Sequence, residues 1–368
     1  MRKLKVGVIG SGAISDIYLK NMTERFPNLE VLSVASAHLE NARKKAEAYH
    51  LSACTVEEML ADPAIEMVVV LTPVGTHAEL IRRALESGKH VYTEKTLTDS
   101  PESAAKLLAL AEEKHLYLGS APDTFLGAAL QTARKAIDEG MLGEIHSFAI
   151  SATRCNDVLL SMFSFLRQPG AGILYDYAVY YLTALVSLLG PVDRVAAMNA
   201  SPYPEHIGMI PGRPEYGQPF ASPNESQVSA IIRLENGVTG TLHMDADSLN
   251  GDEAFFSIYG TEGVLRLTDP NQFGGEVRLI PVRKDGWGVP EGRVLSPVSD
   301  LSDNCRGIGP QEMAEAILEG RPNRAAKEMA YHVLDALNAI LRSGSEGQFM
   351  EVKSSCVRPK AMASSISS

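Results

Sequence analysis

The chain contains 368 residues, of which 45% are apolar and 21% are charged. This length exceeds that of an ordinary single domain and the composition is globular, so we expect two domains with separate cores. The net charge of −11 disfavours nucleic acid or an anionic membrane as a partner, because either would repel the protein at long range. The four cysteines form no CxxC pair, so we predict no metal site, no disulfide framework and a cytoplasmic location.

The first fifteen residues, MRKLKVGVIGSGAIS, have some features of a secretory signal peptide. Glycines and serines interrupt the apolar stretch, and Asp16 ends it without a cleavage-like site, so we interpret it as a strand and a turn. No run of about 18 apolar residues occurs, and we therefore predict no transmembrane helix.

The first third of the chain alternates between short apolar strands and helical segments. The expected strands are Val6–Gly10, Val31–Ala35, Met67–Leu71, His90–Thr93 and Leu116–Gly119, and the expected helices are Ile14–Arg25, Glu40–Tyr49, Ala78–Ser87 and Pro101–Glu113. Strands that alternate with helices of about 10–15 residues predict right-handed βαβ units in a parallel sheet. We predict a Rossmann domain over residues 1–121.

After a further helix at Leu126–Glu139, the expected strands follow one another across short turns. Asn236-Gly237 joins two of them, and the Gly-Thr-Glu-Gly sequence at 260–263 joins two more; such turns are typical of hairpins. The expected strands are Ser226–Leu234, Val238–Met244, Phe255–Tyr259 and Val264–Leu267, and the late helices are Gln311–Glu319 and Ala325–Arg342. We predict an α+β domain over residues 122–368, with a large, mostly antiparallel open sheet.

Two other segments of this domain carry expectations of their own. The six prolines between Ser201 and Asn224 predict an ordered excursion or a flap. The sequence from Ser343 onward is serine-rich, and we expect it to end in a frayed tail.

The turn after the first strand contains Gly10 and Gly12, with Ala13 and Ile14 opening the helix. Gly10 permits a tight turn, and Gly12 lets the backbone approach a pyrophosphate at the helix N-terminus. Ser15 stands where a third glycine is usual, and its small size still allows close packing of helix and strand. The position in a βαβ unit predicts dinucleotide binding, the alternative being a structural turn.

The end of the second strand normally carries an acidic residue that binds the adenosine ribose. This chain has Ala35-Ser36-Ala37-His38 there, and no carboxylate would repel a 2′-phosphate. Ser36 can donate to such a phosphate, and His38 and Arg43 add positive charge nearby. We therefore expect NADP in preference to NAD, although the ribose contact can also come from elsewhere.

Two later strands end in polar residues. Thr72, Pro73 and His77 follow the third strand, and Glu94 and Lys95 follow the fourth. Loops at the carboxyl ends of parallel strands line the ligand crevice, so we assign these residues to the cofactor site, with Lys95 also a candidate acid/base or substrate donor. His77 alternatively belongs only to the start of its helix.

Asp176 and Tyr180 lie four residues apart in an otherwise apolar segment. On a helix they share one face, which predicts a paired functional site; a buried polar pair or a helix-capping Asp is the alternative.

Taken together, these motifs resemble the Gfo/Idh/MocA oxidoreductases, the glucose–fructose oxidoreductase and inositol dehydrogenase family. The resemblance runs from GVIGSGAIS through THAELIRRALESGKHVYTEK to GPQEMAEAILEGRPNRA. The family's EKP motif reads Glu94-Lys95-Thr96 here, and its GGGxxxDxxxH motif spans Gly170 to Tyr180. Tyr180 replaces the motif's His, as in the dihydrodiol dehydrogenase branch. The resemblance implies that Lys95, Asp176 and Tyr180 are catalytic.

The resemblance also implies hydride transfer between nicotinamide and a hydroxyl carbon of a sugar, cyclitol or glycoside. Tyr180 would exchange the hydroxyl proton, cationic Lys95 would lower the pKa of Tyr180, and Asp176 would orient Lys95 or the substrate. Three candidate substrate contacts follow the first strand of the second domain: Arg154, Asn156 and Asp157.

Two alternatives of other classes stay open: an NAD-dependent glycosidase or lyase acting by transient sugar oxidation, and a non-catalytic sugar-sensing regulator. We also expect a homodimer or homotetramer formed through the second-domain sheet, because the strand Gln227–Leu234 offers apolar residues on both alternations.

Overall fold

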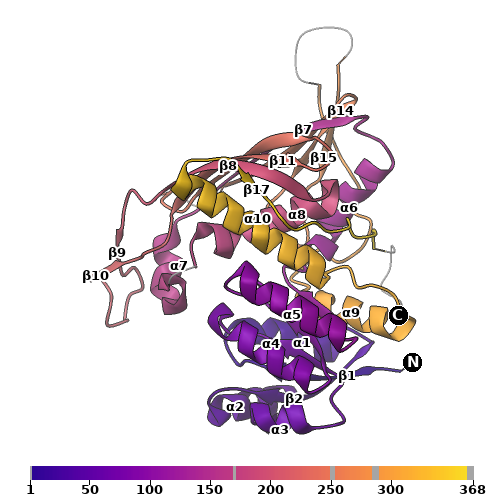
Figure 1. The fold of residues 1–368 in the computed structure, drawn as a ribbon, viewed down its shortest axis with the longest axis vertical. Coiled ribbons are helices and arrows are strands. Elements are labelled where there is room, and N and C mark those ends of the chain that lie inside the picture. The colour runs from indigo at the N-terminus through magenta and orange to yellow at the C-terminus, as the bar shows by residue number, and fades with distance from the viewer. Residues whose placement is uncertain (1, 169–170, 249–252, 284–289, 363–368) are drawn as a thin grey trace.

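The computed structural model describes residues 2–168, 171–248, 253–283 and 290–362. In the view of Figure 1, a Rossmann domain occupies the lower half and a broad sheet lies above it. This arrangement confirms the predicted fold class, a Rossmann domain followed by an α+β domain with an open sheet.

The Rossmann sheet is parallel throughout, with strand order β3-β2-β1-β4-β5-β6. Its central strand β4 is fully buried, as its uninterrupted Val and Met residues predict for a strand covered on both faces. The strands are β1 (Leu4–Ile9), β2 (Leu29–Ala35), β3 (Ser52–Cys54), β4 (Met67–Val70), β5 (His90–Thr93) and β6 (Leu118–Ser120). The helices are α1 (Ile14–Glu24), α2 (Leu39–Tyr49), α3 (Val56–Ala61), α4 (His77–Glu86) and α5 (Pro101–Glu113).

The second sheet has nine strands in the order β16-β15-β14-β13-β7-β12-β11-β8-β17. Only the β7–β12 pair is parallel within this described sheet, so the predicted antiparallel character is confirmed. The strands are β7 (Ile145–Thr153), β8 (Val192–Ala200), β11 (Gln227–Leu234), β12 (Thr239–Asp245), β13 (Glu253–Gly260), β14 (Gly263–Leu267), β15 (Arg278–Pro281), β16 (Arg293–Val294) and β17 (Met350–Glu351).

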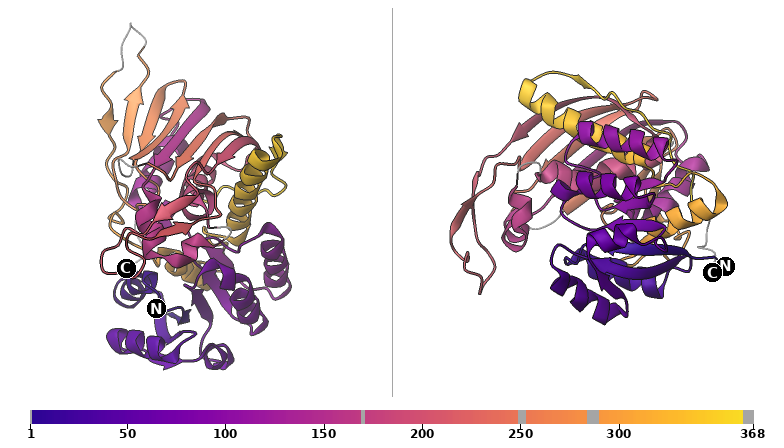
Figure 2. Two further views of the ribbon diagram at one scale, coloured as in Figure 1. Left: turned by 90° about the vertical axis from the view of Figure 1, so that its left-hand side faces the viewer. Right: turned by 60° about the horizontal axis from the view of Figure 1, so that its bottom comes forward.

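Helices cover one face of this sheet. They are α6 (Ala128–Asp138), α8 (Val179–Leu189) and α10 (Lys327–Glu346), and α10 also contacts α5 of the Rossmann domain (Figures 1 and 2). A further helix, α9 (Ile308–Glu319), contacts α1, β5 and β6. The C-terminal part of the chain therefore packs against the N-terminal domain and holds the two domains together.

The other face of the sheet is exposed at β11, whose residues alternate strictly between buried and accessible. Val228, Ala230 and Ile232 point into the core, while Ser229 and Arg233 are exposed. Of the apolar residues expected on both alternations of this strand, Ile231 is the only large one on its outer face.

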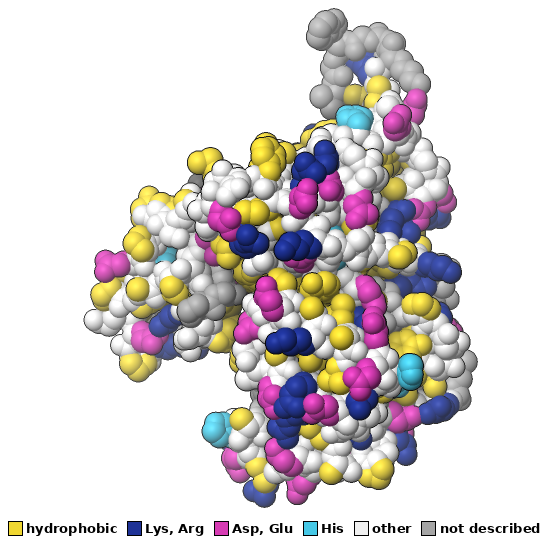
Figure 3. Space-filling model, viewed as in Figure 1, with side chains coloured by type: hydrophobic (Ala, Val, Ile, Leu, Met, Phe, Trp, Pro, Cys, Tyr) yellow, Lys and Arg dark blue, Asp and Glu magenta, His cyan; other side chains and the backbone are white. Residues whose placement is uncertain are grey.

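The proline-rich segment forms an ordered arm, as expected, with β9 (Glu205–Ile207) paired to β10 (Pro219–Ala221). The arm packs on the short helix α7 (Asn156–Met162). There the Arg167 guanidinium lies 3.9 Å from the ring centroid of Phe220. Figure 3 shows hydrophobic side chains gathered on this arm. Its exposed large apolar residues include Tyr203, Ile207, Met209 and Tyr216.

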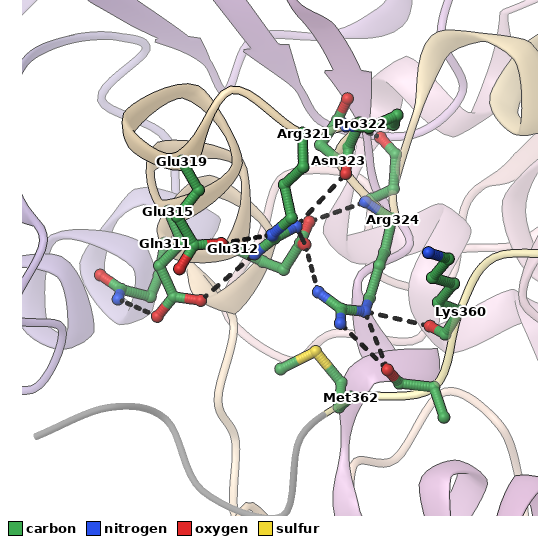
Figure 4. A network of polar contacts seen from close by, with 12 residues as sticks. Gln311, Glu312, Glu315, Glu319, Arg321, Pro322, Asn323, Arg324, Lys360 and Met362 are labelled. Atoms are coloured by element: carbon green, nitrogen blue, oxygen red, sulfur yellow. Dashed lines mark hydrogen bonds and ion pairs between the residues drawn. The ribbon is translucent and has the colours of Figure 1, made fainter.

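The chain from Ser343 to Met362 is held in place, and the serine-rich end that we expect to fray, residues 363–368, lies outside the described residues. Helix α10 continues to Glu346, and a network around the buried Glu312 carboxylate then fastens the tail (Figure 4). Arg324 donates to Glu312 Oε1 at 2.6 Å and to the Ala361 carbonyl oxygen at 3.0 Å. Hydrogen bonds from an arginine side chain to the backbone of the tail hold this segment in place, although a serine-rich sequence has little tendency to be ordered by itself.

Within the described residues, no helix has the length and apolar character needed to cross a membrane.

Candidate active site

The candidate site lies where the carboxyl ends of β1, β4 and β5 meet. These strands are adjacent and parallel, so the residues that follow them are brought to one edge of the sheet. The segments concerned are Gly10–Ile14 after β1, Thr72–His77 after β4 and Glu94–Thr96 after β5.

The glycine turn after β1 has the geometry that a pyrophosphate needs. Gly10 has φ +122°, and a Cβ there would lie 2.6 Å from the Leu71 carbonyl oxygen, so only glycine fits. A Cβ on Gly12 would meet no described atom within 4 Å, and Ala13 is exposed at the start of α1. The backbone from Gly12 to Ile14 is therefore open to a phosphate at a helix N-terminus, and these residues fit a dinucleotide.

Beside this turn, Ser36 follows β2 and is joined to Ser11. The Ser11 hydroxyl donates to Ser36 Oγ at 2.8 Å, so Ser36 keeps its own proton for a further acceptor. His38 and Arg43 are exposed. Ser11 was not among the predicted cofactor residues, since sequence spacing does not show that the two turns touch.

Thr72 and Pro73 lie at the end of β4 and are at least partly accessible, whereas His77 is fully buried. The His77 ring nitrogens contact the Thr96 carbonyl oxygen at 2.9 Å and the Thr72 carbonyl oxygen at 2.8 Å. Neither nitrogen is available to a cofactor. The buried ring of His77 therefore does not offer a nitrogen for the expected contact with the cofactor. Instead, it links the loops after β4 and β5.

Glu94 connects the end of β5 to α1. Its carboxylate accepts a hydrogen bond from the Tyr18 hydroxyl at 2.7 Å and another from the Lys95 backbone N–H at 3.0 Å. The Lys95–Thr96 peptide bond is cis, and Thr96 is buried. The Lys95 side chain points from this turn toward the second domain, where it reaches Asp176.

Lys95 and Asp176 form an ion pair between the two domains. Lys95 Nζ lies 2.6 Å from Asp176 Oδ1 and 2.8 Å from the Asp176 carbonyl oxygen, and Arg154 Nη1 lies 3.4 Å from Asp176 Oδ2. Burial acts to raise the pKa of Asp176, but Lys95 and Arg154 hold it below its ordinary value. Burial likewise acts to lower the pKa of Lys95, and Asp176 and Tyr180 more than offset that effect.

Asp176 and Tyr180 come from the segment that opens α8. Residues Leu174–Ala178 form a π-helical turn, which α8 continues from Val179; Gly170, at the start of the predicted motif, lies outside the described residues. Lys95 Nζ is 5.6 Å from the Tyr180 ring centroid, so the three predicted catalytic residues lie together. π-helical turns occur often at functional sites.

The expected lowering of the Tyr180 pKa is wrong as a net effect. Burial raises the pKa of the phenol more than Lys95 lowers it, and Glu94 adds to the increase. Lys95 therefore acts in the expected direction, but desolvation of the phenolate outweighs its effect.

One further cation that acts on Tyr180 was not predicted from the sequence. Arg306 precedes α9, far along the chain, and its positive charge acts to lower the pKa of Tyr180. No motif or period in the sequence marks it, because only the packing of α9 against the Rossmann domain brings this segment to the crevice.

The three predicted substrate-binding residues have different surroundings in the structure. Arg154 faces the site, with its guanidinium 4.2 Å from the ring centroid of Tyr177. Asn156 begins α7 and donates its backbone N–H to the Ala246 carbonyl oxygen at 2.9 Å. Asp157 contacts the β9–β10 arm: the Asp157 Oδ1 atom lies 2.6 Å from His206 Nδ1. Arg154 is thus the one of these three that contacts the catalytic cluster.

Comparison with known protein families gives two matches. Residues 4–121 match an oxidoreductase family with an NAD-binding Rossmann fold, and residues 130–266 match the GFO/IDH/MocA C-terminal domain.

Among curated relatives, the chain is 30% identical over 293 residues to dTDP-3,4-didehydro-2,6-dideoxy-alpha-D-glucose 3-reductase of Streptomyces violaceoruber, covering 76% of this chain and 81% of that protein. It is 27% identical to the scyllo-inositol 2-dehydrogenase (NADP+) of Bacillus subtilis over 53% of this chain. The chain spans only 54% of the length of that enzyme, and the same share of an uncharacterised oxidoreductase of Schizosaccharomyces pombe.

A solved structure of levoglucosan dehydrogenase in complex with NADH and levoglucosan has the same fold. It superposes with a TM-score of 0.81 at 23% identity, covering 96% of this chain and 100% of that one. The domain matches and the relative from Streptomyces lead to one identification: the chain belongs to the Gfo/Idh/MocA family of NAD(P)-dependent oxidoreductases.

Proposed function

We propose that the protein transfers a hydride between NAD(P) and a hydroxyl-bearing carbon of a sugar, cyclitol or glycoside. The observation that carries the proposal is the Lys95–Asp176 ion pair beside Tyr180, at the edge where the glycine turn would receive the cofactor. The names of relatives that act on sugars and inositol support the substrate class.

In this proposal the nicotinamide, when bound, supplies hydride chemistry that no side chain can perform. Tyr180 accepts the hydroxyl proton as the phenolate during oxidation and donates it as the phenol during reduction. Lys95 provides positive charge beside the substrate oxygen and the phenolate. Asp176 holds Lys95 in place through its 2.6 Å ion pair, and Arg154 fixes the other carboxylate oxygen. Holding the reacting groups in this arrangement lowers the entropic part of the activation free energy.

We further propose that NADP is preferred to NAD. The pair of hydroxyls at Ser11 and Ser36 stands where a carboxylate would favour NAD. Exposed His38 and Arg43 add positive charge close to the expected position of a 2′-phosphate.

A homodimer or homotetramer formed through the open face of the nine-stranded sheet is part of the proposal. This face carries the exposed side chains of Met198 on β8, Ile231 on β11 and Phe255 on β13. Apolar groups spaced over one open sheet are typical of a surface that a second copy covers. The cytoplasmic location expected from the cysteines stays a prediction.

The proposal is tested by mixing the protein with NADP+ or NAD+ and a panel that includes levoglucosan and scyllo-inositol. Growth of the reduced-nicotinamide absorbance with one or more members of the panel is the expected result. Consumption of a glycoside without net cofactor reduction would instead indicate the redox-neutral glycosidase or lyase. Ligand binding without any turnover across the panel would indicate a sensor.

A further inference from the structure

Arg154 is a mostly buried cation that is only weakly paired. It follows β7, and its side chain is 13% exposed. Arg154 Nη1 lies 3.4 Å from Asp176 Oδ2, which is long for a hydrogen bond between charged groups, usually about 2.7–2.9 Å. Lys95 holds the same carboxylate more closely, at 2.6 Å. Two cations therefore share one carboxylate, and Arg154 has the weaker contact.

The other donors of the Arg154 guanidinium are unpaired within the described part of the chain. Arginine has five N–H donors and no acceptor, and the contact with Asp176 is the only side-chain hydrogen bond that Arg154 makes to a described residue. Its Nε atom is buried and has no hydrogen-bond partner there. Buried donors are nearly always paired in native proteins, so each exception needs a physical reason.

Arg167 shows how a similar arginine of the same domain is satisfied. Its side chain is 14% exposed, and its guanidinium lies 3.9 Å from the ring centroid of Phe220. Arg167 Nε donates to the Leu160 carbonyl oxygen and Nη2 donates to Glu215 Oε2, both at 2.8 Å. Arg154 is equally buried but lacks the two corresponding bonds. The difference points to an acceptor that a ligand brings to Arg154.

The Arg154 guanidinium is held in one orientation. The Arg154 backbone N–H donates to the Asp245 carbonyl oxygen at 2.8 Å, and the guanidinium lies 4.2 Å from the ring centroid of Tyr177. The Tyr177 hydroxyl in turn donates to Asp269 Oδ2 at 2.9 Å. Because the ring covers one face and Nε is buried, a ligand can reach this guanidinium only at its Nη groups.

Lys95 and Arg154 approach the Asp176 carboxylate at different oxygens, Lys95 at Oδ1 and Arg154 at Oδ2. A hydroxyl bound beside Lys95 and an acid group bound at Arg154 therefore belong to different carbons of one molecule. We propose that Arg154 is a specificity-determining residue that binds a carboxylate of the substrate, and that the substrate is a sugar acid, such as a uronate or an aldonate.

The chemistry of a guanidinium favours this class of substrate. Its planar pair of Nη groups matches the two oxygens of a carboxylate, and such charge-assisted bonds are about twice as strong as neutral ones. The carboxylate also provides a second anion for the two cations that share Asp176. This inference rests on the proposed function and narrows its substrate class.

The test measures binding rather than turnover. The full chain is titrated by calorimetry, in the presence of NADPH or NADH, with methyl D-glucuronoside, methyl D-galacturonoside and D-gluconate, and with the neutral amide of each. These ligands have no aldehyde or ketone and the reduced cofactor accepts no hydride, so no reaction occurs. At least one acid should bind roughly 10- to 100-fold more tightly than its amide, the usual gain from a hydrogen bond to a charged group.

Arg154→Met keeps the apolar stem and removes the donors. It should lower the affinity for the acid by roughly 10- to 100-fold and change the affinity for the amide little. Arg154→Lys, which keeps the charge but not the planar pair of donors, should recover part of the loss. Arg167→Met is the matched control and should change neither affinity. If Arg154→Met does not fold, the comparison of acid with amide in the wild type and in Arg154→Lys decides.

Equal binding of acids and amides by the wild type, or binding of neither, would overturn the inference, as would an acid preference that persists in folded Arg154→Met. Tighter binding of D-glucose 6-phosphate than of every acid would reject the carboxylate. Turnover of neutral sugars without a preference for acids would reject this inference alone. Binding of an acid without any turnover would reject the proposed function and leave the carboxylate site in place.

Discussion

Lys95 Nζ and Asp176 Oδ1 lie 2.6 Å apart and join the end of Rossmann strand β5 to the π-helical turn before α8. The side chains of both residues are mostly buried, with 18% and 17% exposure. The contact therefore serves two purposes: it fixes the angle between the domains at the site, and it places a cation next to Tyr180.

Breaking this ion pair should destabilise the protein. Lys95→Met leaves Asp176 with Arg154 alone, and we expect a loss of roughly 1–3 kcal/mol in the free energy of unfolding, between the values for exposed and fully buried pairs. Urea unfolding of Lys95→Met, Asp176→Asn and the double variant measures it. The double variant should lose less than the sum of the single variants, and additivity would contradict the pairing.

The same pair predicts a pH dependence of stability. The pKa of Asp176 is held below its ordinary value in the folded protein, so its stabilising contribution is present above the ordinary range of an unfolded Asp, about 4, and is lost as the pH falls through the folded value. Comparing unfolding at pH 7 and at about pH 2, below the ordinary range of an Asp, should show a smaller difference for Asp176→Asn than for the wild type.

Tyr180→Phe removes only the ionisable hydroxyl. Turnover of a sugar substrate should fall by roughly 10²–10⁴-fold, the usual contribution of a general acid/base, while cofactor affinity stays unchanged. Single-turnover hydride transfer measures the chemical step directly. A folded Tyr180→Phe protein with nearly the full rate would show that another residue moves the proton.

Gly12→Val should abolish cofactor binding without harming the fold. The added side chain enters space that no described atom occupies within 4 Å of its Cβ, so the melting temperature should be close to that of the wild type. Gly10→Val is the contrasting variant, because its Cβ would collide with the Leu71 backbone. Calorimetry with NADP+ checks the prediction, and unchanged affinity in Gly12→Val would refute the assignment of the turn.

Ser36→Asp should weaken NADP(H) binding selectively, because a carboxylate repels the 2′-phosphate and accepts from the ribose of NAD. Ser36→Ala separates this repulsion from simple loss of the hydroxyl that Ser11 contacts at 2.8 Å. Measuring the dissociation constants of NAD(H) and NADP(H) for both Ser36 variants tests this prediction. Equal losses for NAD and NADP in Ser36→Asp would count against the proposed preference.

Light scattering at micromolar concentration should give the mass of a dimer or tetramer. Ile231→Glu, on the outer face of β11 where the residue is 58% exposed, should shift the protein toward monomer. Tyr216→Glu on the β9–β10 arm is the control and should not change the mass. A monomeric wild type would rule out the sheet interface.

The local sequence determined the folding units and the motifs that they carry. Buried β-branched runs such as Met67–Val70, and helix ends such as Pro101 after Ser100, are specified by neighbouring residues. The strand–glycine–helix order around Gly10 therefore predicts a dinucleotide turn, and Asn236-Gly237 predicts the β11–β12 hairpin. Each of these depends on contacts within a few residues, which periodicity and turn chemistry describe well.

Only the tertiary structure decided how distant groups meet. The electrostatic interaction of Arg306 with Tyr180, the Ser11–Ser36 pair and the use of both His77 nitrogens by backbone carbonyls arise from the docking of separate segments. The pKa of Tyr180 was misjudged from sequence for the same reason. Charge can be read from residue identity, but the desolvation that raises this pKa depends on what the whole fold packs around the phenol.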